Sequence, residues 1–370
     1  MSLNKELVHK IRRKQGDDRI ILSLEEKAFC VSVPKDGIPV EREARDVKDF
    51  LSQISSAQVA WVDYIVEDLG RDASEVAKSL GFTGNVTSAL LKSGHAGYED
   101  LDDELGLMLP AILVSGFDVK TEYLIILMRA GLVVTIHTTQ VKRFFRLRRY
   151  AKIFMRKIKP ALSKQDKQTH VLIRIIDENN ARNFDHLREI ESSADKLSEK
   201  LSNVHTPREE IGKNIHEMKH ALISYLTGLW ETVDVLNTLR YGDPELLTDD
   251  PKLLQRLGSL VVEVNYQIGL AEHLSEVLAS GLEVMQSIYN NQLQILNNKM
   301  ALLVAYLTVI GTAVLVPNTL ATALSNPAFR MGPEDAGWYS ALMVASTVIS
   351  TLVAYLWVKH KGLLPDGWGE

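Results

Sequence analysis

Two apolar stretches near the end of the chain decide its fold: Met300–Val316, MALLVAYLTVIGTAVLV, and Trp338–Val358, WYSALMVASTVISTLVAYLWV. The first contains 17 residues and the second 21, and none of them is charged. A helix needs about 20 apolar residues to cross the hydrocarbon core of a bilayer. The uncharged sequence continues past Pro317 as far as Phe329, which allows a first span over 299–325. We therefore predict two transmembrane helices rather than a buried hairpin of a soluble core.

The charged residues that flank these spans predict their orientation. Basic flanks remain on the cytoplasmic side of a membrane. Lys299 precedes the first span, and Lys359, His360 and Lys361 follow the second, whereas the loop 326–337 carries Arg330, Glu334 and Asp335. We expect a cell-membrane protein with both termini in the cytoplasm, an external loop over 326–337 and a cytoplasmic tail over 359–370.

The composition outside the spans is typical of a cytoplasmic protein. Nearly all of the chain before residue 299 is amphipathic and charged. Its one cysteine, Cys30, excludes an internal disulfide and suits a reducing compartment. The first residues, MSLNKELVHKIRRK, contain no apolar run of the kind that a secretory signal requires. A net charge of −5 argues against a nucleic-acid partner.

Residues 1–165 are predicted to form an α+β domain. The expected strands are rich in apolar, β-branched and aromatic residues, and they are two short strands within 20–33, one over 57–65, one over 105–117 and a pair within 123–137 that turns near 129–131. A short helix is expected over 72–80, with Asp72 as its N-cap and Gly81 at its end.

The sequence after residue 165 has the apolar spacing of helices. Residues 166–250 are predicted to form a helical hairpin that ends at the Gly- and Pro-containing break 241–251. We find no comparable break between Lys252 and Val316, so one long stalk helix over 251–325 is expected to continue into the first span. A helix of this length needs partners, and we expect copies of the chain to supply them.

A stripe of polar and small residues follows one face of this helix. Its members alternate at spacings of three and four residues: Asn291, Gln294, Asn298, Ala301, Ala305, Thr308, Thr312, Leu315, Thr319, Thr322 and Asn326. A shift of one residue replaces Thr319 by Asn318. Polar groups avoid lipid, so the stripe predicts either a water-filled pore or a dry helix–helix interface. In a pore, amide oxygens would contact the water shell of Mg²⁺, and Leu315 would close the path by dewetting.

Several short motifs resemble the CorA family of magnesium channels, and together they cover almost the whole chain. They are Val59–Asp63 (VAWVD), Tyr98–Glu104 (YEDLDDE), Leu132–His137 (LVVTIH), Tyr289–Asn291 (YNN), Leu307–Ile310 (LTVI) followed by Pro317, and Lys359–Leu363 (KHKGL). The resemblance implies a funnel-shaped homopentamer in which the first span lines a pore for divalent cations, Mg²⁺ above all.

One signature of that family is missing. The Gly-Met-Asn motif at the outer end of the first span is replaced by Ser325-Asn326-Pro327, which keeps only the asparagine. Zn²⁺ or another divalent metal is therefore an alternative cargo. No tightly held cofactor is expected besides the transported and regulatory cation.

The resemblance also implies regulation by intracellular metal ions at acidic contacts between subunits. Asp100, Asp102, Asp103 and Glu104 are the candidates, and a solvated acidic loop is the alternative. Outside the membrane, Glu334 and Asp335 are expected either to concentrate cations at the pore mouth or to form an ordinary turn.

Two further motifs allow other functions. His216-Glu217-Met218-Lys219-His220 matches HExxH, the zinc site of one class of proteases, although no third ligand follows. The segment 141–159 contains nine basic residues and no acidic one, and we expect a helix packed on the α+β domain rather than one that binds lipid or nucleotide. The expected function is thus a channel and not an enzyme, with a non-conducting scaffold and a metalloprotease as alternatives.

Overall fold

The computed structural model describes residues 27–202, 208–326, 329 and 332–360. The chain divides into two compact units, Met1–Ala279 and Ser280–Glu370. Helix α9 (Pro251–Leu324) passes through the boundary between them as one uninterrupted helix of 74 residues. The predicted long helix is thereby confirmed, including its continuation through Pro317.

The first unit is built around a mixed seven-stranded sheet with the order β2-β1-β3-β7-β6-β5-β4. Its strands are β1 (Ala28–Pro34), β2 (Val40–Ala44), β3 (Ala57–Val66), β4 (Gly97–Leu101), β5 (Glu104–Ser115), β6 (Asp118–Arg129) and β7 (Leu132–Thr138). Only β3 and β7 pair in parallel among these strands. The sheet confirms the predicted α+β domain.

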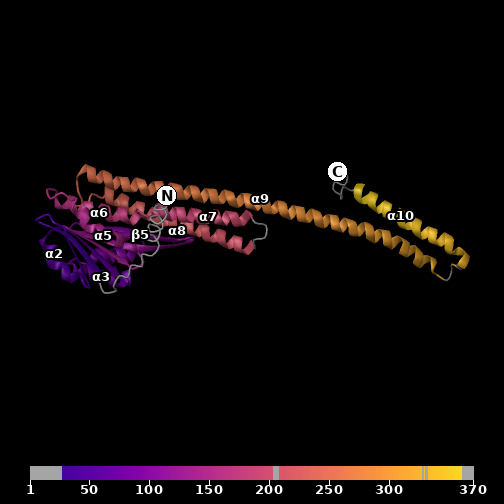
Figure 1. Ribbon diagram of the computed structural model, residues 1–370, viewed down its shortest axis with the longest axis horizontal. Helices are drawn as coiled ribbons and strands as arrows, with labels where there is room; N and C mark the ends of the chain where they lie inside the picture. Colours follow the sequence, from indigo (N-terminus) through magenta and orange to yellow (C-terminus); the bar gives the residue numbers. More distant parts are fainter. Residues whose placement is uncertain (1–26, 203–207, 327–328, 330–331, 361–370) are drawn as a thin grey trace, which may run out of the picture. The chain divides into compact units, whose positions relative to one another are not determined.

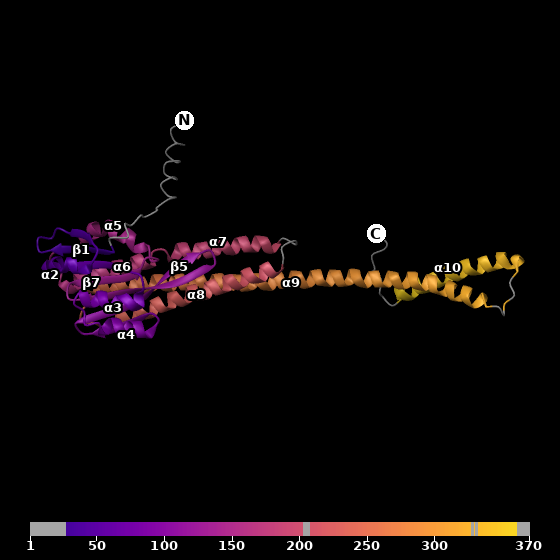
Figure 2. The ribbon, with the colours of Figure 1, turned by 90° about the horizontal axis from the view of Figure 1, so that it is seen from below.

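Helices cover both faces of this sheet because its central strands bury both sets of alternating side chains. Trp61 packs into a core with α5 (Arg143–Met155), α6 (Lys164–Asn180) and α8 (Arg208–Tyr241). Its neighbour Val62 packs into the opposite core. There it meets η1 (Val47–Phe50), α2 (Leu51–Ser56), α3 (Leu69–Ser79) and α4 (Asn85–Ser93). Figure 2 shows α3 and α4 along one side of the strands and α5 on the other.

The strands predicted over 57–65, 105–117 and 123–137 are found as β3, β5, β6 and β7, whereas the edge strands β2 and β4 were not predicted. One predicted strand also differs in length. β6 begins at Asp118, five residues before the predicted strand, because the sequence Asp118–Glu122 is polar and half exposed but still pairs with β5. β1 confirms the strand that precedes Pro34, whereas the part of the prediction over 20–26 lies outside the described residues.

The predicted start of the first helix after β3 is wrong. α3 begins at Leu69, and its N-cap is Asp68, whose carboxylate accepts a bond of 2.9 Å from the amide of Arg71. The carboxylate of Asp72 accepts a bond of 3.2 Å from the amide of Asp68. Two aspartates thus share the first turn, and the earlier of them supplies the N-cap.

Three helices, rather than the two of a hairpin, occupy the region before the break at 241–251. α6 ends at Asn180 and α7 (Asn183–Ser202) begins three residues later. Long-range bonds hold this junction: the Tyr225 hydroxyl donates to the Asn183 carbonyl over 2.6 Å, and the Asn183 amide donates to Gln267 over 3.1 Å. α7 and α8 then lie side by side (Figure 1).

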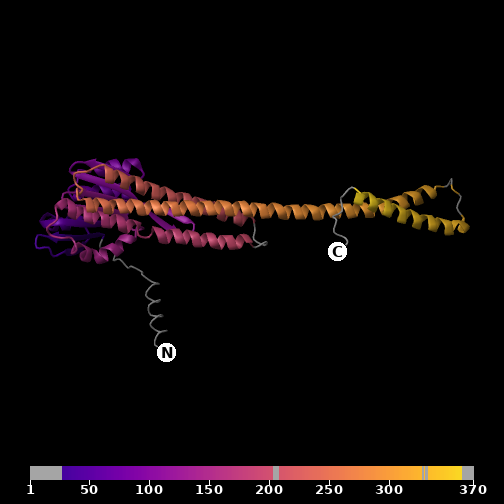
Figure 3. The ribbon, with the colours of Figure 1, turned by 90° about the horizontal axis from the view of Figure 1, so that it is seen from above.

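The second unit contains the end of α9, a short turn η2 (Pro333–Asp335) and α10 (Ala336–His360), which returns along α9 (Figure 3). Both helices are long and apolar enough to cross a membrane. Only 11% and 17% of the residues in their most apolar segments are buried. A core helix of a soluble protein would bury most of such a segment, so the two helices are suited to a lipid environment.

Candidate functional site

The predicted pore-lining residues lie along α9, with Asn326 two residues beyond its end. Ten of the twelve side chains are exposed in the single chain, while Ala305 is buried and Thr312 half-buried. The ten exposed residues are Asn291, Gln294, Asn298, Ala301, Thr308, Leu315, Asn318, Thr319, Thr322 and Asn326.

The apolar part of α9 has three distinct faces. Half-buried side chains mark the face that α10 covers, and they include Leu302, Val309, Ala313, Leu320 and Leu324. At 3.6 residues per turn, the centre of the polar stripe is about a third of a turn from this face, and its members Ala305 and Thr312 lie closest to the covered side. A third face consists of the exposed apolar side chains Leu303, Leu307, Ile310 and Val314. The second span of the same chain therefore leaves most of the polar stripe uncovered.

The threonines of the stripe satisfy their own donors within the helix. The hydroxyl of Thr308 donates to the carbonyl of Val304 over 2.8 Å, and Thr319 bonds Leu315 in the same way. Thr312 and Thr322 repeat the pattern over 2.8 and 2.7 Å. The lone pairs of each hydroxyl oxygen remain available as acceptors. The stripe can thus offer oxygen ligands to water or to a cation without leaving a donor unsatisfied.

The two acidic residues predicted at the external mouth have different environments. Asp335 accepts bonds from the amide of Gly332 (2.9 Å) and from the indole Nε1 of Trp338 (3.0 Å). Both bonds lower the pKa of Asp335, and the bond from the amide of Gly332 has the larger effect. Glu334 is exposed and makes no hydrogen bond or ion pair with any described residue. Asp335 therefore shapes the turn before α10, and Glu334 is the carboxylate available to ions.

The acidic run between β4 and β5 does not converge on a metal site within one chain. Glu104 is buried, and its carboxylate accepts bonds from Thr83, at 2.7 Å from the amide and 2.8 Å from the hydroxyl. Asp100 accepts a bond of 3.2 Å from the hydroxyl of Tyr98. Asp102 and Asp103 are exposed in the tight turn. Across the described residues, no group of three or more His, Cys, Asp or Glu could hold a metal ion.

A buried polar network that the sequence pattern did not single out connects β3, β7 and α5. Asp63 is fully buried; its carboxylate accepts bonds from Thr135 (2.5 Å) and Arg148 (2.6 Å) and lies 3.1 Å from Nε2 of His137. Thr135 in turn accepts a bond of 3.1 Å from the indole of Trp61. Asp63 lies in the motif VAWVD, and Thr135 and His137 lie in LVVTIH, but neither motif indicated that these side chains meet Arg148.

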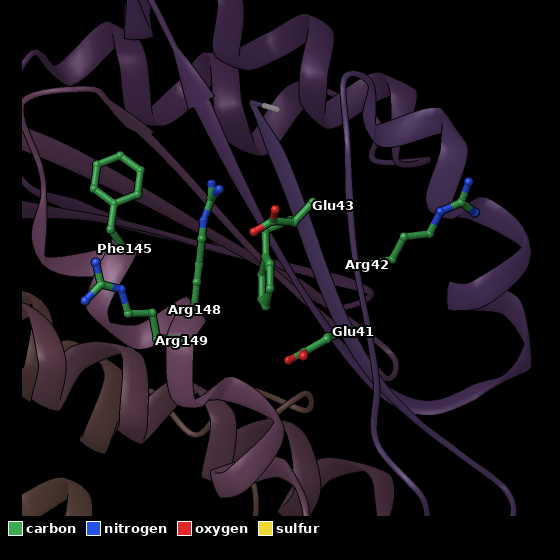
Figure 4. A pocket seen from close by; sticks show the side chains of 7 residues that line it. Glu41, Arg42, Glu43, Phe145, Arg148 and Arg149 are labelled. Atoms are coloured by element: carbon green, nitrogen blue, oxygen red, sulfur yellow. The ribbon is translucent and has the colours of Figure 1, made fainter. Parts of the chain in front are cut away.

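A hollow of about 460 Å³ opens beside this network, between β2 and α5 (Figure 4). The guanidinium of Arg148 lies 5.6 Å from the ring centres of both Phe29 and Phe145. The remaining lining residues are Glu41, Arg42, Glu43 and Arg149. The guanidinium of Arg42 points away from the other lining side chains (Figure 4) and donates to the carbonyl of Asp49 over 3.3 Å. Arg148 is already paired with Asp63, so the hollow does not offer a cluster of unpaired basic groups to an anionic ligand.

The basic segment 141–159 folds as predicted. α5 packs against the sheet through Phe144, Leu147, Ala151 and Met155, which are all buried. Of its apolar side chains, Ile153 remains exposed. This packing accounts for the apolar residues that alternate with the basic ones.

The HExxH motif lies on α8 without the surroundings of a protease site. His216 and His220 are exposed, and Glu217 forms an ion pair with Lys213 at 3.8 Å. No third ligand stands near the two histidines among the residues that the structure describes. The general base and the closed ligand set that zinc hydrolysis requires are therefore not assembled here.

His186, near the start of α7, makes stability sensitive to acid. Burial, followed by the charges of Arg143 and Arg182, lowers its pKa to about 4, and its Nδ1 has no hydrogen-bond partner in the described part of the chain. Between about pH 6.5 and 4 the unfolded chain binds a proton that the folded chain does not bind. We expect stability to fall with decreasing pH in this range, by at most about 1.4 kcal/mol per pH unit.

The measurement is the thermal unfolding midpoint of the detergent-solubilised chain across this pH range. His186→Leu should flatten the dependence, and His273→Leu, at an exposed position of α9, should leave it unchanged. An unaltered slope in His186→Leu would show that other groups cause the acid sensitivity.

The chain matches a protein-family model and is similar to several solved structures. The family model described as "CorA-like Mg2+ transporter protein" matches residues 56–360. The complete structure of the CorA magnesium transporter from Methanocaldococcus jannaschii is similar with a TM-score of 0.64 and 18% identity, over 88% of this chain and 96% of that one. No curated protein sequence gives a significant match.

Two further solved structures share the fold. The full-length CmaX protein has a TM-score of 0.60 and 15% identity, over 90% of this chain and 99% of that one. The cytoplasmic domain of ZntB from Vibrio parahaemolyticus RIMD 2210633 has a TM-score of 0.50 and 16% identity, over 72% and 99%. At these identities the likeness concerns the fold.

Proposed function

Because the chain belongs to the CorA-like Mg2+ transporter family, we propose that it is a homopentameric channel that passes divalent cations across a membrane, with Mg²⁺ as the principal ion. Each of five copies contributes α9 to the wall of a central pore. The transported cation is its cargo, and no other cofactor takes part.

The observation that carries this proposal is the uncovered polar stripe on α9. The face of α9 that α10 covers is about a third of a turn from the centre of the stripe, and the exposed apolar face carrying Leu303, Leu307 and Val314 suits lipid or a neighbouring copy. Polar side chains within a membrane face a protein interior or water. Repetition of α9 around an axis supplies such an environment, with the oxygens of Thr308 and Thr319 turned to the axis.

The chemistry of the stripe favours a hard, hydrated ion. Its polar members carry only hydroxyl and amide groups, and it contains no thiolate, imidazole or carboxylate. Neutral oxygen ligands suit Mg²⁺, which keeps most of its water shell, whereas Zn²⁺ prefers nitrogen and sulfur ligands. Zn²⁺ is the second candidate, since the Gly-Met-Asn motif is absent and the cytoplasmic domain of ZntB has a similar fold.

The remaining features complete the proposed channel. The basic residues Lys299 and Lys359 at the span ends favour a cytoplasmic location for both termini. Glu334 at the external turn attracts cations to the entrance. Asp102 and Asp103, exposed on each copy, are the groups best placed to bind a regulatory cation together with an adjacent subunit, and Leu315 forms an apolar ring that closes the pore when it dries.

Ion flux into proteoliposomes tests the function directly. The purified chain is reconstituted around an ion-sensitive dye, and Mg²⁺, Zn²⁺, Co²⁺ and Ni²⁺ are added in turn with an inside-negative potential. We expect Mg²⁺ uptake well above that of protein-free vesicles. Uptake of Zn²⁺ without Mg²⁺ would favour the second candidate, and no uptake of any ion would identify a membrane-anchored scaffold.

A further inference from the structure

His216 and His220 occupy one exposed face of α8 and are separated by a single helical turn. Their ring centres are 6.5 Å apart. Zinc–nitrogen bonds are about 2.0–2.1 Å long, and both side chains are exposed. Small rotations of these side chains would therefore let one ion bind both rings. A pair of imidazoles at positions i and i+4 of a helix is a recurrent basis for binding transition metals.

The surroundings of the pair leave it open to a ligand. Side chains on a helix lean toward its N-terminus, so His216 leans over the position of Gly212, which has no side chain. A Cβ atom added at Gly212 would meet no atom within 4 Å. Glu217 and Lys213 are engaged with each other through their ion pair. Lys219, next to His220, is exposed, so its long side chain can extend into solvent away from the two rings.

A neighbouring hydroxyl orients one of the rings. Oγ of Ser224, one turn after His220, lies 3.4 Å from Nδ1 of that histidine. When one ring nitrogen of a histidine is held by a second residue, the other nitrogen is left to face a metal. Nε2 of His220 is then the nitrogen that remains for coordination.

We propose that His216 and His220 form a bidentate site for a divalent transition-metal ion, with water in the remaining coordination positions. Imidazole suits Zn²⁺, Ni²⁺ and Cu²⁺, whereas Mg²⁺ prefers oxygen. The site thus distinguishes these metals from Mg²⁺ and lies on the first unit, outside the spans. It does not depend on the proposed transport function.

Isothermal titration of the full-length, tag-free chain in detergent with NiCl₂ tests the site. We expect wild type to bind one Ni²⁺ per chain. His216→Ala and His220→Ala should each lower the Ni²⁺ affinity by on the order of tenfold or more, because one ligand of the chelate is lost. The matched control is His273→Ala, at an exposed histidine of α9 with no histidine one turn away, and it should bind Ni²⁺ as wild type does.

Gly212→His provides a test by gain of function, since it adds a third imidazole to the same face and should tighten Ni²⁺ binding. A titration with MgCl₂ should show no heat that either histidine substitution removes. Wild-type Ni²⁺ affinity in both alanine variants would overturn the proposal. Mg²⁺ flux into proteoliposomes should be the same in these variants as in wild type, so loss of the site and loss of transport can be told apart.

Discussion

Replacement of Asp63 by alanine is expected to destabilise the first unit by about 3–5 kcal/mol, because it leaves Arg148 buried without its counter-ion. The carboxylate is fully buried and contacts Thr135, His137 and Arg148 within 3.1 Å. Burial alone raises the pKa of Asp63, but the charge of Arg148 and then that of His137 lower it further, so the net pKa is below its usual range.

The sign of the pH effect follows from this lowered pKa. A carboxylate whose pKa is lower in the folded chain contributes stability that is complete above its unfolded pKa of about 3.9 and is lost only as the pH falls through the folded value. The contribution of Asp63 is therefore fully present at neutral pH. The variant should be less stable than wild type throughout the range from pH 5 to 8.

The unfolding midpoint of the full chain in detergent measures this effect, and Trp61, which is bonded to Thr135, supplies a fluorescent probe inside the network. The matched control is Glu67→Ala, which removes an exposed ion pair with Lys27 and should change little. The double variant Asp63→Ala/Arg148→Ala should lose less than the sum of the two single variants. A midpoint for Asp63→Ala equal to that of the control would contradict the proposed role of the network.

The second large effect is expected on ion flux when hydroxyls are removed from the polar stripe. Thr308, Thr312 and Thr319 are each replaced by valine, which keeps the shape of the side chain but presents a methyl group to the proposed pore. Five copies would then add fifteen apolar groups to the lumen, and such a lining favours dewetting. We expect Mg²⁺ flux to fall by about tenfold or more, which corresponds to ~1.4 kcal/mol in the barrier.

The controls use the other span and the apolar ring. Thr347 and Thr351 on α10 also bond the carbonyl one turn earlier, and their replacement by valine should leave flux near that of wild type. Leu315→Thr should act in the opposite direction and increase flux, since it removes the apolar ring from the stripe. Equal flux in the α9 and α10 threonine variants would place the stripe at a dry interface.

The sequence alone was sufficient for features that depend on neighbouring residues. Apolar runs and their flanking charges identified both candidate spans, and the lack of a strong break after residue 251 predicted the continuous α9. The strands around Val62 and Val133 could also be identified, because β-branched and aromatic residues are concentrated there. Hydrophobic periodicity is a local property of the sequence, so it indicates helices and strands without information about tertiary contacts.

Only the tertiary structure decided which side chains meet and which faces are covered. Asp63 and Arg148 are 85 residues apart in the chain, and no local pattern indicates that they form an ion pair. The break between α6 and α7 depends on the hydrogen bonds that join Asn183 to Tyr225 and to Gln267. The exposure of the polar stripe depends on where α10 packs. Such contacts bring together distant segments of the chain, and their stability comes from joint burial of both partners, a property that neither segment has by itself.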